Sequence, residues 1–461
     1  MRFDKLAAIT GGTVYNTAVA ERIFTGVAGD SRAVVPGQLF VAIRGERNDG
    51  HDFINDAIAA GASGIIAEYD WPGLAHVRGD VAVVAVPNSH EAMLALATAY
   101  RDRLTARFVA ITGSNGKTTT KELTYHLLSA VTSPVYRSPG NLNNLFGVPL
   151  ALFGVPQDAS EVVLELGIST ELEMPRLARI VRPDLIAITN VGPSHLKFLD
   201  SIESVARTKL ELVRAAADDV PVIINGDDRI LVEQTKASGR DFITFALDRE
   251  TDFTVDAVEP LGFEGTAVTI EGHRFHLPLV GRHQVGNLLA AYAIVRTLGF
   301  NFDDIDTEAI ALTTAPMRGQ IVVHHGVTFL SDCYNANPES VKAGLQAFFS
   351  LPALSRRIVV LGDMLELGRE TARYHRQIGR QLADCDFDLA ALVGPLARGI
   401  YDDLLSAGRD ETTCLHFTDA ASCAEELGER FAAGDLVYVK GSRGVGLEVV
   451  IDRFAEHGGE A

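Results

Sequence analysis

The chain has 461 residues, of which 47% are hydrophobic and 22% are charged, and its formal net charge is -19 at pH 7. That length exceeds what one hydrophobic core supports, so we expect about two to four domains of ordinary globular composition. So negative a charge argues against nucleic acid or an anionic membrane surface as a partner, because their phosphates would be repelled. The four cysteines form no CxxC pair, the N-terminus lacks a signal-peptide core, and no run approaches the ~20 apolar residues of a membrane span. We therefore expect free thiols in a cytoplasmic protein that does not insert into a membrane.

The first block, residues 1–105, reads as a small α/β domain. It holds short strands such as "QLFVAI" and "GIIAE", with the helix "FINDAIAAGA" between them. The stretch "HEAMLALATAYRDRLTARF" then predicts a helix that leads into the next block.

The second and third blocks, residues 106–314 and 315–461, repeat a pattern of strand and helix. In the second, "EVVLELG", "DLIAITNVG" and "VPVIINGDD" are short apolar runs that end in Gly, Asn or Asp. They predict a mostly parallel sheet with helices on both faces and functional loops at the carboxyl ends of its strands. In the third, "RRIVVLGDM", "LAALVG" and "DLVYVKGSRG" predict a Rossmann-like α/β domain, although no GxGxxG indicates a dinucleotide site. The fold class is therefore α/β, in three domains.

A phosphate loop opens the second block in "VAITGSNGKTTTKELTYHLLSAV". Gly113 and Gly116 let successive N–H groups turn toward an anion, and the helix that begins near Lys117 adds its positive end. Lys117 can reach the outer phosphates and Thr118 can join the coordination of Mg²⁺. The loop is shorter than the standard G-x-x-x-x-G-K-[ST], and the alternative is a polar turn that only caps a helix. A GTPase is disfavoured because the sequence has no Asn-Lys-x-Asp string.

Three later residues fall where a parallel sheet would present them beside this loop. Glu165 ends a strand, His195 follows the next one, and Lys209 lies in the helical "SIESVARTKLELV". Glu165 and His195 are candidate metal ligands, although each could instead form only local hydrogen bonds. Lys209 could contact phosphate, form a salt bridge, which is the default, or react with CO₂ as a neutral amine to give a carbamate.

These motifs resemble the Mur ligase family, ATP-dependent amide ligases of bacterial cell-wall precursor synthesis. The short loop "TGSNGKTTT" is followed in the family's order by "VLELG", "NVGPSH", "KLEL" and "GRHQVGNLLAAYA". "GDSRAVVPGQLFVAIRGERNDGHDFI", "GNLNNLFGVPL", "SDCYNANPES", "VVLGDMLELG" and "YVKGSRG" are similar to the member that adds a D-Ala-D-Ala dipeptide. Cys333 and "RGVGLE" depart from the usual pattern at positions away from the expected chemistry.

The resemblance implies roles for individual residues. Lys117, Lys209 and His195 would be catalytic, and Thr118, Glu165, His195 and a carbamylated Lys209 would hold one or two Mg²⁺ ions. His195 and Asp332 are candidates for the base that deprotonates the attacking amine. The uridine-nucleotide and sugar-diphosphate ends of the acceptor would meet Ser31 and Arg32, and Asn141 and Asn144. The residues implied to bind ATP are Gly113, Ser114, Asn115, Gly116, Lys117, Thr118, Thr119, Asn287, Arg318, Asp332, Tyr334 and Asn335.

The implied reaction joins D-Ala-D-Ala to UDP-N-acetylmuramoyl-tripeptide at the expense of ATP, through an acyl phosphate, in a monomeric enzyme. The first block would grip the UDP end of the acceptor, the second would carry ATP and metal, and the third would bring the dipeptide and close over ATP. Two alternatives stay open: a ligase similar to folylpolyglutamate synthase, and an ATPase that acts on a protein partner. A binding module without activity is disfavoured, because Lys117, Thr118, Glu165 and His195 are all present.

Overall fold

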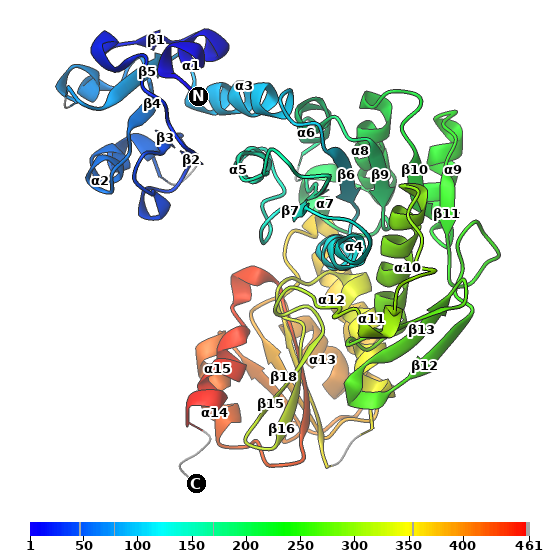
Figure 1. Ribbon diagram of the computed structural model, residues 1–461. Helices are drawn as coiled ribbons and strands as arrows, with labels where there is room; N and C mark the ends of the chain where they lie inside the picture. Colours follow the sequence, from blue (N-terminus) through cyan, green and yellow to red (C-terminus); the bar gives the residue numbers. More distant parts are fainter. Residues whose placement is uncertain (46–47, 78, 169, 353–354, 458–461) are drawn as a thin grey trace. The chain divides into compact units, whose positions relative to one another are not determined.

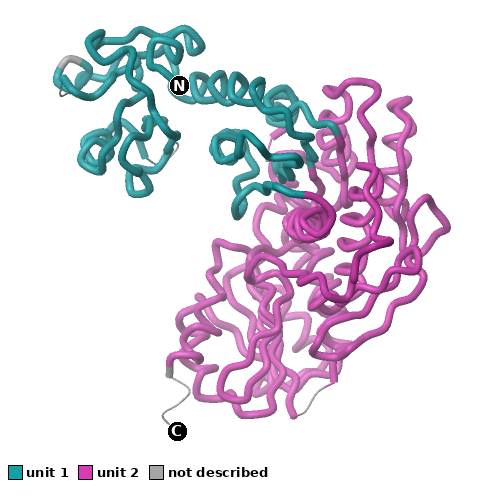
Figure 2. The backbone as a smooth tube through the Cα atoms, viewed as in Figure 1, with its two compact units in different colours: residues 1–110, 133–168, 172–184 teal, residues 111–132, 169–171, 185–461 magenta. Residues whose placement is uncertain are grey.

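The computed structural model describes residues 1–45, 48–77, 79–168, 170–352 and 355–457, and it contains two compact units (Figure 1, Figure 2). Unit 1 comprises residues 1–110, 133–168 and 172–184, and unit 2 comprises residues 111–132, 169–171 and 185–461. The predicted α/β class is confirmed, since mostly parallel sheets alternate with helices in both units. The domain boundaries after residues 105 and 314 stay a prediction.

Unit 1 contains a five-stranded sheet with the strand order β1-β5-β4-β3-β2, parallel except for β1. Alternate strand residues face opposite sides: Ile66 and Val84 pack with α1 and α3, whereas Ile65 and Val83 pack with α2. Its elements are α1 (Phe3–Thr10), β1 (Thr13–Val14), β2 (Val27–Ala28), β3 (Leu39–Val41), α2 (Ile54–Ala59), β4 (Gly64–Glu68), β5 (Ala82–Val86) and α3 (Ser89–Arg101).

The helix α3 is shorter than the sequence predicts. It ends at Arg101, whereas the expected helix ran to Phe108. The guanidinium of Arg101 donates to the carbonyl oxygens of Leu104 and Val181, which holds a turn there. The β-forming residues after that turn enter the buried strand β6 (Arg107–Thr112), whose first residues belong to unit 1. Unit 1 also includes β7 (Val135–Arg137), α5 (Gly147–Phe153), β8 (Glu161–Glu165), parallel to β7, and α6 (Glu173–Val181).

The first part of unit 2 supports the phosphate loop. Strands β9, β10 and β11 are parallel, and α4 packs against α10. A three-stranded antiparallel sheet, β12-β13-β14, follows and was not predicted. The elements are α4 (Lys117–Val131), β9 (Leu185–Ile188), α7 (Leu196–Leu199), α8 (Ile202–Ala215), β10 (Val222–Asn225), α9 (Arg229–Ala237), β11 (Ile243–Phe245), β12 (Ala257–Pro260), β13 (Thr266–Ile270), β14 (His273–Leu277) and α10 (Arg282–Thr297).

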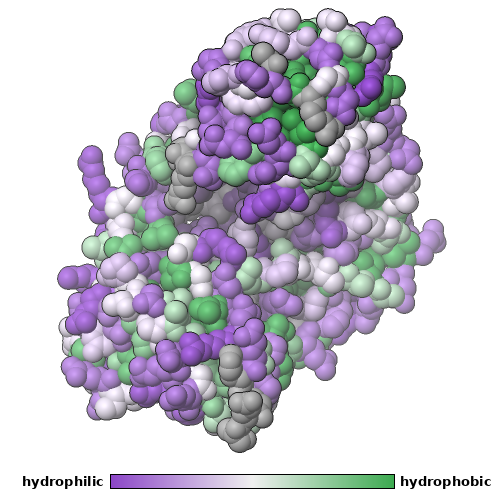
Figure 3. Space-filling model, turned by 90° about the vertical axis from the view of Figure 1, so that its left-hand side faces the viewer, coloured by the Kyte–Doolittle hydropathy of each residue, from purple (hydrophilic) through white to green (hydrophobic). Residues whose placement is uncertain are grey.

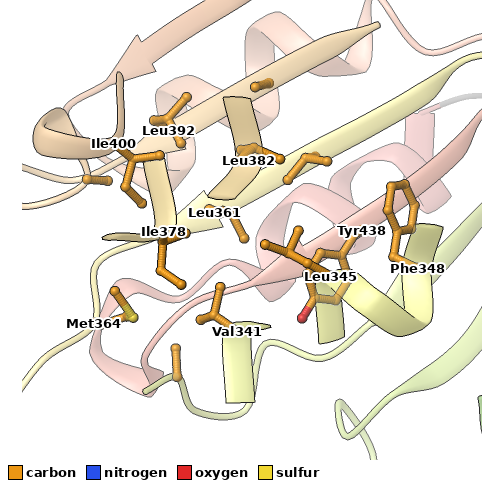
Figure 4. Packing of buried hydrophobic residues seen from close by; sticks show 14 of the residues in the cluster. Val341, Leu345, Phe348, Leu361, Met364, Ile378, Leu382, Leu392, Ile400 and Tyr438 are labelled. Carbon is orange, nitrogen blue, oxygen red and sulfur yellow. The ribbon is translucent and has the colours of Figure 1, made fainter. Parts of the chain in front are cut away.

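The second part of unit 2 contains a six-stranded sheet in the order β15-β16-β20-β17-β18-β19, parallel except for β15. The helices α11, α12 and α13 pack on one face, whose core is drawn in Figure 4, and α14 and α15 pack on the other. The elements are β15 (Gln320–His324), β16 (Val327–Ser331), α11 (Pro338–Ser350), β17 (Arg357–Gly362), α12 (Thr371–Ala383), β18 (Leu389–Val393), α13 (Arg398–Ser406), β19 (Cys414–Phe417), α14 (Ala420–Gly428), β20 (Leu436–Lys440) and α15 (Glu448–His457).

The core in Figure 4 continues beyond the six-stranded sheet of unit 2. Leu196, Leu199 and Val280, which precede that sheet in the chain, are buried in the same cluster as Leu345 and Leu361. Among the described residues, no helix is long and apolar enough to cross a membrane. The surface in Figure 3 mixes hydrophilic and hydrophobic residues, and exposed apolar side chains such as Phe198 are scattered along the chain.

Candidate active site

The phosphate loop connects β6 to α4, and two of its glycines occupy positions where any side chain would clash with a neighbour. Gly113 has φ = 152° and Gly116 has φ = 78°. A Cβ at Gly113 would lie 1.9 Å from Oγ1 of Thr189, and a Cβ at Gly116 would lie 2.2 Å from Oδ1 of Asn287. Backbone conformation and close packing therefore both require glycine at these positions.

The chain that follows β9 fixes the shape of the loop. The N–H of Ser114 donates to the carbonyl oxygen of Asn190 at 2.9 Å, and the N–H of Asn115 donates to the side-chain Oδ1 of the same residue at 2.9 Å. The N–H of Gly192 in turn donates to Oγ of Ser114 at 2.9 Å. The sequence predicted that successive N–H groups of the loop turn toward an anion, but the N–H groups of Ser114 and Asn115 are engaged by Asn190. We therefore expect the donors to be those of the first turn of α4, residues 117–119.

Two lysine side chains converge on one carbonyl oxygen of the loop. Nζ of Lys117 and Nζ of Lys209 each donate to the oxygen of Gly113 at 2.9 Å. Lys209 is buried on α8, and burial together with the neighbouring Lys117 charge lowers its pKa well below the usual value. Within the described ranges no carboxylate pairs with Lys209, so the salt bridge considered as the default finds no support.

Glu165 lies at the end of β8 in unit 1, as predicted, and is buried. Nδ2 of Asn143 donates to its Oε1 at 2.7 Å, and its own N–H donates to Oγ of Ser138 at 3.3 Å. The carbonyl oxygen of Asn143 also accepts from the N–H of Gly167, which closes a turn around the carboxylate. Asn143 was missed in the sequence, where "GNLNN" offers three asparagines and no sign of which one reaches back to a strand.

The four residues predicted to bind the acceptor also lie in unit 1. Asn144 accepts from the N–H groups of Phe146 and Gly147 and so shapes the start of α5, while Asn141 is exposed. Ser31 is buried, whereas the Arg32 guanidinium extends into solvent and is paired with the carboxylate of Asp30 at 2.7 Å.

His195 precedes α7 and has a left-handed backbone, φ = 54°. Its Nδ1 lies 2.7 Å from Oε2 of Glu366, and that contact lowers the pKa of the Glu366 carboxyl. The adjacent Ser194 donates through Oγ to Oγ of Ser114 at 2.9 Å, so His195 is one residue from a direct contact with the phosphate loop. Glu366 was missed because it lies 171 residues away in the sequence.

The remaining predicted nucleotide residues form two groups in unit 2. Asn287 is buried beside the loop, where its Nδ2 donates to Oε1 of Gln284 at 2.9 Å. The Arg318 guanidinium lies over the Tyr334 ring, 4.0 Å from its centroid, which is a cation–π geometry.

The chain after β16 combines a charged pair with a link to the phosphate loop. Nζ of Lys440 lies 2.6 Å from Oδ2 of Asp332 and also donates to the carbonyl oxygen of Asn335. Nδ2 of Asn337 donates to Oδ1 of Asn115 in the phosphate loop at 2.6 Å. The structure thus brings the third block of the sequence to the loop through Asn337, which was not among the predicted residues.

The donor types present suit Mg²⁺ that arrives with a nucleotide. In the part of the chain that the structure describes, no three or more His, Cys, Asp or Glu side chains gather to hold a metal by themselves. Mg²⁺ is commonly bound through one or two protein groups together with substrate phosphates and water. A hydroxyl at Thr118, a carboxylate at Glu165 and an imidazole at His195 fit that pattern in chemistry.

Comparison with known proteins gives matches over most of the chain. Three family models match: "Mur ligase family, catalytic domain" over residues 23–101, "Mur ligase middle domain" over residues 111–295 and "Mur ligase, glutamate ligase domain" over residues 317–443. The UDP-N-acetylmuramoyl-tripeptide–D-alanyl-D-alanine ligase of Bacillus subtilis is 32% identical over 98% of this chain and 97% of its own length. Among solved structures, MurF from Acinetobacter baumannii is similar with a TM-score of 0.86 and 26% identity, covering 99% of this chain and 98% of that one. MurF from Thermotoga maritima in complex with ADP has a TM-score of 0.79 and 28% identity, covering 94% and 97%.

Proposed function

The chain belongs to the Mur ligase family, and we propose that it joins D-Ala-D-Ala to UDP-N-acetylmuramoyl-tripeptide with the conversion of ATP to ADP and phosphate. The product would be UDP-N-acetylmuramoyl-pentapeptide, a precursor of peptidoglycan. The observation that carries the proposal is the phosphate loop, with Lys117 and the buried Lys209 meeting at Gly113. The likeness to the ligase of Bacillus subtilis over nearly the whole of both chains supports the choice of substrates.

The chemistry explains why such an enzyme needs a phosphate loop. A carboxylate and an amine do not condense in neutral water, because the carboxylate is anionic and lacks a good leaving group. Transfer of the γ-phosphoryl group of ATP to the tripeptide carboxylate gives an acyl phosphate. The D-Ala-D-Ala amine attacks its carbonyl carbon and loses a proton, and inorganic phosphate leaves.

Each step gathers negative charge on phosphoryl oxygens, which fixed donors can stabilise. The first-turn N–H groups of α4 and the Lys117 ammonium are those donors in this chain. On nucleotide binding, Lys117 would exchange the Gly113 carbonyl oxygen for the outer phosphates. Bound Mg²⁺, held by Thr118, Glu165 and His195 together with the phosphates, would neutralise part of this charge.

Lys209 has a separate role in the proposal. A buried lysine with a lowered pKa carries the neutral amine that reacts with CO₂, and the carbamate formed on loss of a proton is an anion. That anion would suit a second Mg²⁺ near Lys117, where an ammonium group would not. The lowered pKa and the closeness of Lys117 support this form of Lys209.

The other predicted residues divide the substrates among them. Ser31, Arg32, Asn141 and Asn144 would bind the nucleotide and sugar-diphosphate ends of the acceptor. The remaining ATP contacts would come from the first turn of α4 and from Asn287, Arg318, Asp332, Tyr334 and Asn335. We propose that the enzyme works as a monomer in the cytoplasm.

The two rival functions differ in what they require. A folylpolyglutamate synthase would act on another acceptor, and the match over residues 23–101 together with the similarity to the Bacillus subtilis ligase favours the muramoyl acceptor. An ATPase acting on a protein partner would hydrolyse ATP without either small substrate.

The test is phosphate release from Mg-ATP with the muramoyl tripeptide and the dipeptide supplied singly and together, alongside mass spectrometry of the product. We expect full release only with both substrates, matched one for one by a pentapeptide product. Lys117→Ala should abolish this release, while Lys236→Ala, an exposed lysine on α9, should leave it unchanged. Release that is indifferent to both substrates, without a heavier product, would contradict the ligase.

A further inference from the structure

The loop after β17 makes a double contact with the loop after β9. Oε2 of Glu366 lies 2.7 Å from Nδ1 of His195, and the carbonyl oxygen of Glu366 accepts from the N–H of Lys197 at 3.0 Å. One residue of the third block therefore engages the predicted metal ligand through its side chain and the start of α7 through its backbone.

Both partners in this contact hold an unfavourable backbone conformation. His195 has φ = 54° and Glu366 has φ = 63°, a left-handed region that residues with a side chain rarely adopt. Gly368 also lies close, because a Cβ there would be 3.1 Å from Cα of Lys197. Left-handed residues of this kind persist where surrounding contacts over-determine them, and they gather at functional sites.

The contact decides which ring nitrogen of His195 can bind a metal. A carboxylate accepts and does not donate, so in a neutral imidazole the proton lies on Nδ1 and the lone pair lies on Nε2. Histidines that bind metals generally donate their other ring N–H to a carboxylate or carbonyl group, which fixes both tautomer and ring orientation. The hydrogen bond between Nδ1 of His195 and Glu366 matches this arrangement. It leaves Nε2 as the ring nitrogen that could coordinate a metal.

We propose that Glu366 is a positioning residue of the ligase, which holds His195 in the tautomer and orientation that present Nε2 to the metal accompanying ATP. This inference rests on the proposed function. Because Glu366 belongs to the third block, the metal ligand is oriented only when the loop after β17 is docked on the loop after β9. Docking of the third block and assembly of the metal site are thus one event.

The test compares Glu366→Ala, which removes the acceptor, with Glu366→Gln, which keeps an acceptor oxygen but no charge. The control is Glu370→Ala, which removes a nearby carboxylate that pairs with Arg373. The dissociation constant of ADP is measured with and without Mn²⁺, and the ratio reports metal binding. The tautomer of His195 is read from ¹⁵N chemical shifts, assigned from the signals lost in a His195→Gln variant.

We expect Glu366→Ala to weaken the Mn²⁺ effect about 10- to 100-fold and to shift the His195 tautomer toward Nε2–H. Glu366→Gln should fall between Glu366→Ala and the wild type, and Glu370→Ala should match the wild type. A wild-type Mn²⁺ effect and an unchanged tautomer in Glu366→Ala would overturn the proposal. Failure of the proposed function would instead appear as missing dipeptide-dependent phosphate release in the wild type, a result independent of these binding measurements.

Discussion

At Gly113, a single backbone carbonyl oxygen accepts hydrogen bonds from Nζ of Lys117 and Nζ of Lys209. Burial removes the water that would solvate a charge on Lys209, and the nearby Lys117 charge opposes it further. The pKa of Lys209 is lowered accordingly. A buried lysine with a lowered pKa beside a phosphate loop is suited to chemistry rather than to stability, because its burial costs free energy of folding.

Gly116 gives a test of the loop at the scale of one residue. Its φ of 78° is close to the 72° of Gly239, but only at Gly116 would a Cβ meet a neighbour, Oδ1 of the buried Asn287 at 2.2 Å. Both Gly→Ala changes should add backbone strain of about 1 kcal/mol. We expect Gly116→Ala to displace Asn287 and to raise the dissociation constant of ADP at least tenfold, measured by titration calorimetry. Gly239→Ala, which has open space, should bind ADP as the wild type does, and equal affinities for all three proteins would contradict the steric account.

The residues of this site could be predicted from the sequence where their chemistry depends only on neighbours in one short segment. Gly113, Gly116 and Lys117 follow from one strand, one turn and one helix, and the structure places them as expected. Asn143, Glu366 and Asn337 could not be found, because each acts on a residue far away in the sequence. An asparagine that orients a distant carboxylate has the same local sequence as one that only forms a turn.

The start of α11 shows how one element serves two purposes. Asn337 caps the helix, since its Oδ1 accepts from the N–H of Ser340 at 2.9 Å, and Pro338 occupies the first turn, where no N–H is needed. The same side chain donates from Nδ2 to Asn115 of the phosphate loop. The helix is therefore anchored to the loop through its own cap.

Two substitutions of Asn337 separate these purposes. Asn337→Ser keeps a capping oxygen but loses the donor to Asn115, whereas Asn337→Ala loses both. We expect both variants to weaken ADP binding several-fold. Only Asn337→Ala, which loses the cap, should lower the free energy of unfolding, by ~1 kcal/mol relative to Asn337→Ser. Calorimetric titration and urea unfolding measure the two effects. Wild-type ADP binding in Asn337→Ser would show that the link to the loop has no role in nucleotide binding.

Elements were predictable when their pattern was strong. Buried parallel strands such as β9 and β17 are continuous apolar runs, and they appear where expected. The antiparallel sheet β12-β13-β14 was missed because β12 contains a proline and is exposed throughout, and β14 mixes polar and apolar residues over a short stretch. Such strands are defined by their pairing partners and not by their own composition.

At the scale of the whole molecule, contacts cross the boundary predicted after residue 314. Leu196, Leu199 and Val280 share a buried cluster with Leu345 and Leu361 of the following segment, so this part of unit 2 has a continuous core. His283, at the start of α10, lies close enough to Asp332 and Lys440 for their charges to act on it. The protonation of His283 is therefore linked to the stability of the contact between the two blocks.

The direction of that link gives a prediction for the unfolding of the chain. Burial, aided by the charge of Lys440 and opposed by Asp332, lowers the pKa of His283 from 6.5 to about 4. Below pH 6.5 the unfolded chain binds a proton that the folded chain does not accept until about pH 4, so the free energy of unfolding falls across this range, by up to roughly 3 kcal/mol. We expect urea unfolding midpoints to fall more steeply with acidification in the wild type than in His283→Gln. Burial also lowers the pKa of His375. Because the wild type and His283→Gln both contain His375, its contribution is the same in the two proteins. If the urea midpoints of the two proteins fell equally between pH 6.5 and pH 4, the pKa of His283 would not be lowered in the folded chain.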